Sequence, residues 1–99
     1  MIRAVHVDNL TKNIKEMCIE VNHVLSADMK EALDTSVQTE KSPLGRQILC
    51  QLQENLEIAG KDRIPICQDT GMAIVFLEVG QDVHFEGGSV EDAINEGVR

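Results

Sequence analysis

The stretch "RIPICQDTGMAIVFLEVGQ", Arg63 to Gln81, contains the sharpest change of character in the chain. A proline and a cysteine lead into the polar tetrad Gln68-Asp69-Thr70-Gly71, and the chain then becomes almost purely apolar. The run "MAIVFLEV", Met72 to Val79, does not alternate until Glu78, which is typical of a strand that is covered on both faces. We therefore predict a buried strand at 72–79, with a cysteine and several polar side chains at its entrance.

The residues before this stretch predict three helices. The first runs from about Asp8 to Leu25, because its apolar residues recur at helical spacing and form one stripe. The second covers "ADMKEALDTSV", with Ser26 as its cap. The third begins at Ser42-Pro43, a capping hydroxyl followed by proline, and Gly60 is placed to end it. Its predicted core face consists of Leu44, Ile48, Leu49, Leu52, Leu56 and Ala59.

The residues after the apolar run predict one more short strand and one more helix. In "DVHFE", Val83 and Phe85 fall on one side and His84 on the other. Gly87-Gly88 breaks this strand, and Ser89 then caps a last helix over 90–98. The predicted class is α+β and mainly helical: three N-terminal helices, one or two strands, then a further helix. We expect it to be the opening part of a larger α/β enzyme domain.

Composition narrows the classes of partner. The chain has 99 residues and a formal net charge of −8, with no basic stripe, which argues against nucleic acid and anionic membranes as partners. No apolar run approaches the roughly 20 residues that cross a bilayer, and the N-terminus lacks a signal-peptide core. We therefore expect a cytoplasmic protein. The short chain and its several apolar faces favour burial against a partner, as a homo- or hetero-oligomer.

The three cysteines are Cys18, Cys50 and Cys67. The odd number and the lack of any Cys-x-x-Cys pair argue against a self-contained zinc site, and a reducing compartment argues against a disulfide framework. Cys18 lies at the edge of the first helix's apolar stripe and is expected to act as a small hydrophobe. Cys50 lies opposite the apolar face of its helix.

The residues beside Cys67 allow more than one chemistry. Gln68 offers an amide, Asp69 a carboxylate for general acid or base work, and Thr70-Gly71 a hydroxyl and an accessible backbone N–H. This set could serve a thiolate-bound metal beside a polar substrate, or a nucleophilic cysteine. Asp-Thr-Gly is equally good turn chemistry, so a purely structural turn stays open.

A family resemblance gives these residues a more specific meaning. The segment "RIPICQDTGMAIVFLEVGQDVHFEGGSVEDAINEGVR" and the upstream "SPLGRQILCQLQENLEIA" resemble the α subunit, or α region, of iron–sulfur class I fumarases and of L(+)-tartrate dehydratases. The resemblance covers essentially residues 1–99, read as a single N-terminal piece of the α region. It implies a hydro-lyase that reversibly adds water to a small dicarboxylate, with fumarate or tartrate left open as the substrate.

The resemblance also implies a cofactor and residue roles. Such enzymes hold a [4Fe–4S] cluster by three cysteine thiolates, and Cys67 matches the first of these ligands. Gln68 and Asp69 match substrate-pocket residues, Gln68 for binding and Asp69 for binding and proton transfer. The other ligands belong to the remainder of the α region, which works with a β subunit or region. The 99 residues alone are therefore expected to be inactive.

The role of His84 has more than one interpretation. His84 could line the pocket or relay protons, or it could be a solvent-side histidine on a short strand. His6 and His23 are expected at the surface.

Without the resemblance, the chain could be a non-catalytic interaction module that docks on another protein through its apolar faces. In that case, replacing Cys67 would leave iron content unchanged.

Overall fold

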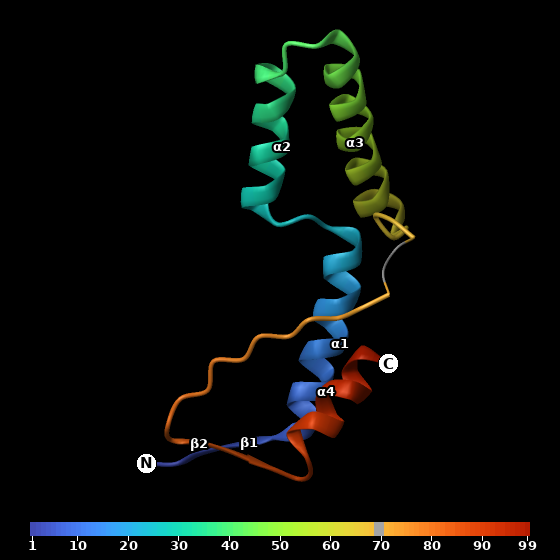
Figure 1. The fold of residues 1–99 in the computed structure, drawn as a ribbon. Coiled ribbons are helices and arrows are strands. Elements are labelled where there is room, and N and C mark those ends of the chain that lie inside the picture. Colours follow the sequence, from blue (N-terminus) through green and yellow to red (C-terminus); the bar gives the residue numbers. More distant parts are fainter. Residues whose placement is uncertain (69–70) are drawn as a thin grey trace. The chain divides into compact units, whose positions relative to one another are not determined.

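A computed structural model describes residues 1–68 and 71–99 (Figure 1). The elements follow the chain as β1 (Arg3–His6), α1 (Val7–His23), α2 (Ala27–Thr39), α3 (Pro43–Asp62), β2 (Val83–Glu86) and α4 (Val90–Val98). The mainly helical α+β class is thus confirmed. The four predicted helices are present, and the last begins and ends where the sequence predicted. The chain divides into two compact units, Met1–Ile19 with Thr70–Arg99, and Glu20–Asp69.

The first unit contains a two-stranded parallel sheet, of which the sequence predicted one strand. Strand β2 has the expected alternation, with Val83 and Phe85 half-buried and His84 exposed. Its partner β1 was not predicted. The two strands pair in parallel, with Val5 opposite Phe85. After β2 the chain turns at Gly87, whose φ of 92° favours glycine, and a Cβ there would also collide with the His6 ring.

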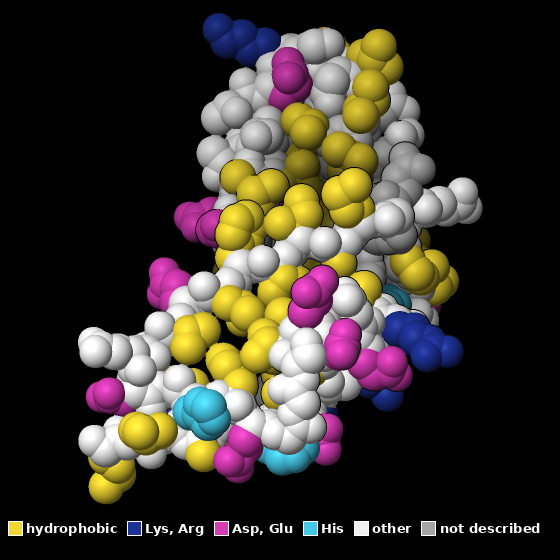
Figure 2. All heavy atoms as spheres, turned by 60° about the horizontal axis from the view of Figure 1, so that its bottom comes forward, with side chains coloured by type: hydrophobic (Ala, Val, Ile, Leu, Met, Phe, Trp, Pro, Cys, Tyr) yellow, Lys and Arg dark blue, Asp and Glu magenta, His cyan; other side chains and the backbone are white. Residues whose placement is uncertain are grey.

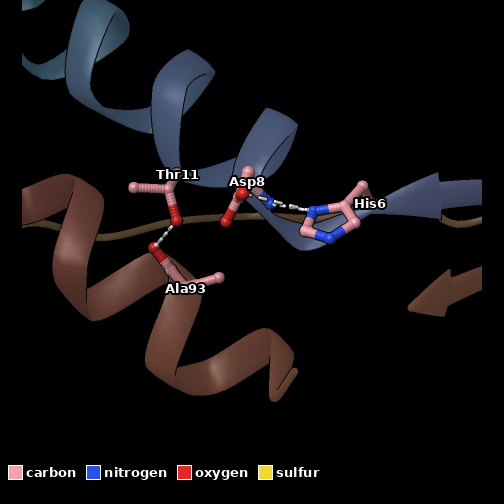
Figure 3. A network of polar contacts seen from close by, with 4 residues as sticks. All are labelled: His6, Asp8, Thr11 and Ala93. Atoms are coloured by element: carbon pink, nitrogen blue, oxygen red, sulfur yellow. Dashed lines mark hydrogen bonds and ion pairs between the residues drawn. The ribbon is translucent and has the colours of Figure 1, made fainter. Parts of the chain in front are cut away.

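Within the first unit, the N-terminal part of α1 packs closely against α4 (Figure 3). The Thr11 hydroxyl donates a 2.8 Å hydrogen bond to the Ala93 carbonyl across the two helices. A Cβ on Gly97 would lie 2.7 Å from Ile14 Cβ and 2.8 Å from the Thr11 carbonyl oxygen. Ile14 is only 4% exposed, and Ala93 and Gly97 are also buried. Small residues on α4 therefore let the two backbones approach each other.

The second unit pairs α2 with α3 through a polar link. Gln53 Nε2 on α3 donates a 2.8 Å hydrogen bond to Asp34 Oδ1 on α2, and Lys30 Nζ lies 3.2 Å from the other carboxylate oxygen of Asp34. The hydrogen bond from Gln53, and then that from Lys30, holds the pKa of Asp34 below its ordinary value. This carboxylate therefore stays ionised through the neutral range.

The helix starts follow the predicted positions, with one difference in chemistry. Ser42 and Ser89 each accept a hydrogen bond from the backbone N–H three residues on, which confirms both caps. Ser26 is the N-cap residue of α2, but its side chain makes no capping hydrogen bond. It bonds the Asp28 carboxyl instead, and with the Met29 amide this lowers the pKa of Asp28.

The end of α3 differs from the prediction. Gly60 lies inside the helix, which continues to Asp62, because a glycine costs a helix only about 1 kcal/mol and does not block its hydrogen bonds. Arg63 ends the helix in a left-handed conformation, with φ 56° and ψ 43°. The Arg63 and Ile64 amides both donate to the Ala59 carbonyl, as at many helix C-termini.

The predicted buried strand at 72–79 is wrong in this structure. Residues 71–80 form no helix or strand (Figure 1), and all of them are exposed. Met72 is 84% exposed and Phe76 is 91% exposed. An apolar run becomes a buried strand only where neighbouring strands pair with it and other elements cover its faces. Within the described residues, β1 and β2 pair only with each other, and neither pairs with this run.

The hydrophobic core is correspondingly small. Among residues 1–68 and 71–99, the buried apolar residues are Val7, Ile14, Ala59 and Ala93. Much of the predicted apolar face of α3 is exposed, including Leu44, Ile48 and Leu52. Figure 2 likewise shows many hydrophobic side chains open to view on the surface. Helical periodicity thus located the helices correctly, although much of the face that it marked is not covered in this structure.

Candidate functional site

Two of the predicted site residues, Cys67 and Gln68, follow α3 in the second unit. Cys67 and Gln68 are both exposed, in a segment without helix or strand. Asp69, the predicted proton-transfer residue, lies outside the described residues, as does Thr70. The structure therefore places the predicted thiolate ligand and the predicted amide next to each other at the surface, just beyond the end of a long helix.

The backbone that leads to Cys67 is held at several points. The guanidinium of Arg63, the left-handed residue at the end of α3, lies 3.7 Å from the Glu20 carboxylate. The Ile66 amide donates a 2.7 Å hydrogen bond to the carbonyl of Asn22, near the end of α1. The Ile66 carbonyl accepts a 3.0 Å hydrogen bond from Asn55 Nδ2, on α3. The residue immediately before the cysteine is thus fixed through both of its backbone polar groups.

Sequence reasoning missed Asn55 and Asn22. Asn55 lies eleven residues before Ile66 on an exposed face of α3, and an asparagine there carries no local motif. Its position one or two turns before the helix end, followed by a chain reversal, is the signal that could have drawn attention to it.

The other candidate residues lie elsewhere. Cys18 is half-buried, in keeping with a small apolar residue at the edge of the α1 stripe, and Cys50 is exposed on α3. His84 is exposed on β2, opposite Ala4 in the register. His23 was expected at the surface but is half-buried, because it lines a hollow of about 390 Å³ with residues of α2 and α3. Among the described residues, neither Cys67 nor Gln68 lines that hollow.

The donor set tests whether an iron–sulfur cluster fits this site. Cysteine sulfur is the usual ligand of such clusters, and Cys67 presents one cysteine side chain at an exposed and anchored position. Within 1–68 and 71–99, no three histidine, cysteine, aspartate or glutamate side chains gather as a metal site. The described residues thus fit one ligand of a cluster and not a complete set.

No helix among the described residues is long and apolar enough to cross a membrane.

One known family matches the chain over a region that includes this site. The profile of one family, described as Fumarate hydratase (Fumerase), matches residues 11–99 and therefore includes α3, Cys67 and Gln68. The chain belongs to this fumarate hydratase family. The resemblance predicted from "RIPICQDTG" and the neighbouring segments is thereby confirmed at the level of the family.

Individual relatives give the same result. Over 87 residues the chain is 34% identical to a Methanocaldococcus jannaschii protein provisionally named L(+)-tartrate dehydratase subunit alpha, covering 87% of the chain and 30% of that protein. It is 41% identical over 59 residues to the anaerobic class I fumarate hydratase of Escherichia coli K12, covering 60% of the chain and 11% of that enzyme. The aerobic class I enzyme of the same strain is 36% identical over 72 residues, covering 73% and 13%.

The chain therefore spans less than a third of the length of the curated relatives it matches. No solved structure matches it significantly.

Proposed function

We propose that this chain is the N-terminal part of the α region of an iron–sulfur hydro-lyase, which reversibly adds or removes water at a small dicarboxylate such as fumarate. The observation that carries the proposal is the family match over residues 11–99, which includes the cysteine and amide exposed after α3. The names of the relatives, fumarate hydratase and tartrate dehydratase, support the same reaction class.

In this proposal Cys67 supplies one of three thiolate ligands of a [4Fe–4S] cluster. When bound, such a cluster supplies an open iron that acts as a Lewis acid toward a substrate oxygen. Gln68 binds a carboxylate or hydroxyl of the substrate, since an amide can both donate and accept hydrogen bonds. Asp69 contributes to substrate binding and transfers the proton. The exposure of Cys67 and Gln68 supports roles that require contact with groups from outside the described residues.

The partners follow from the incomplete ligand set. We propose that the remainder of the α region and a β subunit or region supply the missing thiolates and cover the exposed apolar residues, within a homo- or hetero-oligomer. The large exposed apolar surface supports this, because soluble proteins rarely leave such patches uncovered. In addition, the subunit name of the tartrate dehydratase relative implies a second kind of subunit.

The substrate has two candidates. Fumarate is favoured by the family description and by the two Escherichia coli relatives. L(+)-tartrate is favoured by a different observation, since the relative with that name aligns with 87% of the chain. Rates of fumarate hydration and of L(+)-tartrate dehydration, measured side by side on the complete enzyme, distinguish the two.

The test of the function compares Cys67→Ala with Cys50→Ala in the complete enzyme, purified without oxygen and reconstituted with iron and sulfide. Both cysteines are exposed and lie in the same unit, so they form a matched pair. We expect Cys67→Ala to lose most bound iron and the hydro-lyase activity, and Cys50→Ala to keep both. Full iron content in the Cys67→Ala enzyme would contradict the proposed ligand and would favour the interaction-module alternative.

A further inference from the structure

We infer that Asn55 is a positioning residue for Cys67: its side-chain amide fixes the peptide that precedes the cysteine and so sets where the thiolate is presented. The inference rests on the proposed function, because Cys67 must be a cluster ligand for its position to matter. The inference adds Asn55 to the residues that serve the proposed site. No sequence motif indicates this role, and Asn55 lies on α3, which contains neither Cys67 nor Gln68.

The first step is the geometry at Ile66. Asn55 Nδ2 donates a 3.0 Å hydrogen bond to the Ile66 carbonyl oxygen, and the Ile66 amide donates a 2.7 Å hydrogen bond to the Asn22 carbonyl. One bond comes from α3 and the other from the end of α1. Because the two bonds hold both polar groups of one residue, Ile66 can neither slide along the helices nor turn about its own axis without breaking one of them.

The second step follows from peptide planarity. The Ile66 carbonyl and the Cys67 N–H belong to the same planar peptide unit and point in opposite directions. When Asn55 holds the carbonyl, it therefore also fixes the direction of the Cys67 N–H and the position of the Cys67 Cα, from which the side chain starts. The thiol then keeps two freedoms: the φ torsion of Cys67, which swings its Cβ about the N–Cα bond, and its side-chain rotamer.

The third step is that α3 does not need Asn55 for its own stability. Asn55 lies within a 20-residue helix and is exposed, and alanine is a better helix former than asparagine. The reach of Asn55 to Ile66 is thus separable from the folding of α3. Residues that orient metal ligands from outside the ligand set commonly change metal affinity by about 10- to 100-fold when they are replaced.

The experiment uses the complete, cluster-loaded enzyme and measures the rate of iron release to the chelator ferrozine. Asn55→Ala removes the donor, and Asn55→Asp keeps the shape but replaces the donor with a carboxylate oxygen that repels the carbonyl. Gln51→Ala is the matched control, since Gln51 is an exposed amide on the same helix and makes no side-chain hydrogen bond within the described residues. Asn55→Gln restores an N–H donor on a side chain that is longer by one methylene group.

We expect iron release at least about 10-fold faster for Asn55→Ala and Asn55→Asp than for Gln51→Ala, with partial recovery in Asn55→Gln. The electron paramagnetic resonance spectrum of the reduced cluster should shift in the same variants, while the thermal unfolding midpoint follows the control. If Cys67→Ala loses its iron but Asn55→Ala releases iron as slowly as Gln51→Ala, the positioning role is refuted and the proposed function stands. If Cys67→Ala keeps its iron, the proposed function itself fails.

Discussion

Replacing Gly97 by alanine should loosen the contact between α4 and α1. The new Cβ would lie 2.7 Å from Ile14 Cβ and 2.8 Å from the Thr11 carbonyl oxygen. Carbon atoms pack best at about 3.5–4.0 Å, so the two helices must separate by roughly 1 Å. One of the obstructing atoms is a backbone oxygen, which no side-chain rotation can move away.

The magnitude follows from three contributions. Overpacking a well-packed contact costs about 1–3 kcal/mol. Separation also stretches the 2.8 Å hydrogen bond from Thr11 to the Ala93 carbonyl, which is worth about 1 kcal/mol. Alanine returns about 1 kcal/mol through its better helix propensity. The net loss in the free energy that holds α4 in place is therefore about 1–3 kcal/mol, or roughly a 5- to 150-fold change in the opening equilibrium.

Amide hydrogen exchange measures this opening directly, because it reports local unfolding residue by residue. In the Gly97→Ala protein, the amides of α4 should exchange faster by the stated factor. Gly60→Ala is the matched control: Gly60 is also a glycine within a helix, but a Cβ there would meet only the His23 carbonyl oxygen at 3.7 Å. Its helix should exchange no faster than before. Unchanged or slower exchange of α4 in Gly97→Ala would refute the close approach of the two helices.

Two further predictions concern the turn after β2 and the pairing of α2 with α3. Gly87→Ala should destabilise the first unit by at least about 1 kcal/mol, because both the positive φ and the His6 ring oppose a Cβ. His6→Ala should relieve only part of that loss, as a double-mutant cycle of unfolding free energies can show. The lowered pKa of Asp34 means that its bond from Gln53 stabilises the fold above the unfolded pKa of about 4 and is lost as pH falls through the folded value. Gln53→Leu should raise the pKa of Asp34 in a titration followed by nuclear magnetic resonance, whereas an unchanged pKa would show that the hydrogen bond is not its cause.

Local sequence signals predicted the helices well. Helical periodicity needs only neighbouring residues, and the serine caps at Ser42 and Ser89 act over three positions, so both can be read from the chain alone. The end of α3 was harder, because Gly60 can either stop a helix or continue it. The choice depended on Arg63 adopting a left-handed conformation, for which the sequence carries no clear sign.

Non-local pairing explains the two errors in the strands. Strand β1 is four residues long and finds its partner at Val83–Glu86, about 80 residues later, so no local pattern marks it. The run 72–79 shows the reverse situation, a strong local pattern without a pairing partner among the described residues. Strand propensity expresses fit to a covered, pleated surface, and that surface must come from elsewhere in the molecule.

The same distinction applies to the candidate site. The sequence identified Cys67 and Gln68 through a family motif and placed them at the entrance of a predicted buried strand. In the structure the support precedes the cysteine: α3 ends at Asp62, Asn22 and Asn55 hold Ile66, and Cys67 comes next. The two arrangements differ in consequence. Support from a following strand would tie Cys67 to whatever pairs with 72–79, whereas support from α3 and α1 positions it independently of any such pairing.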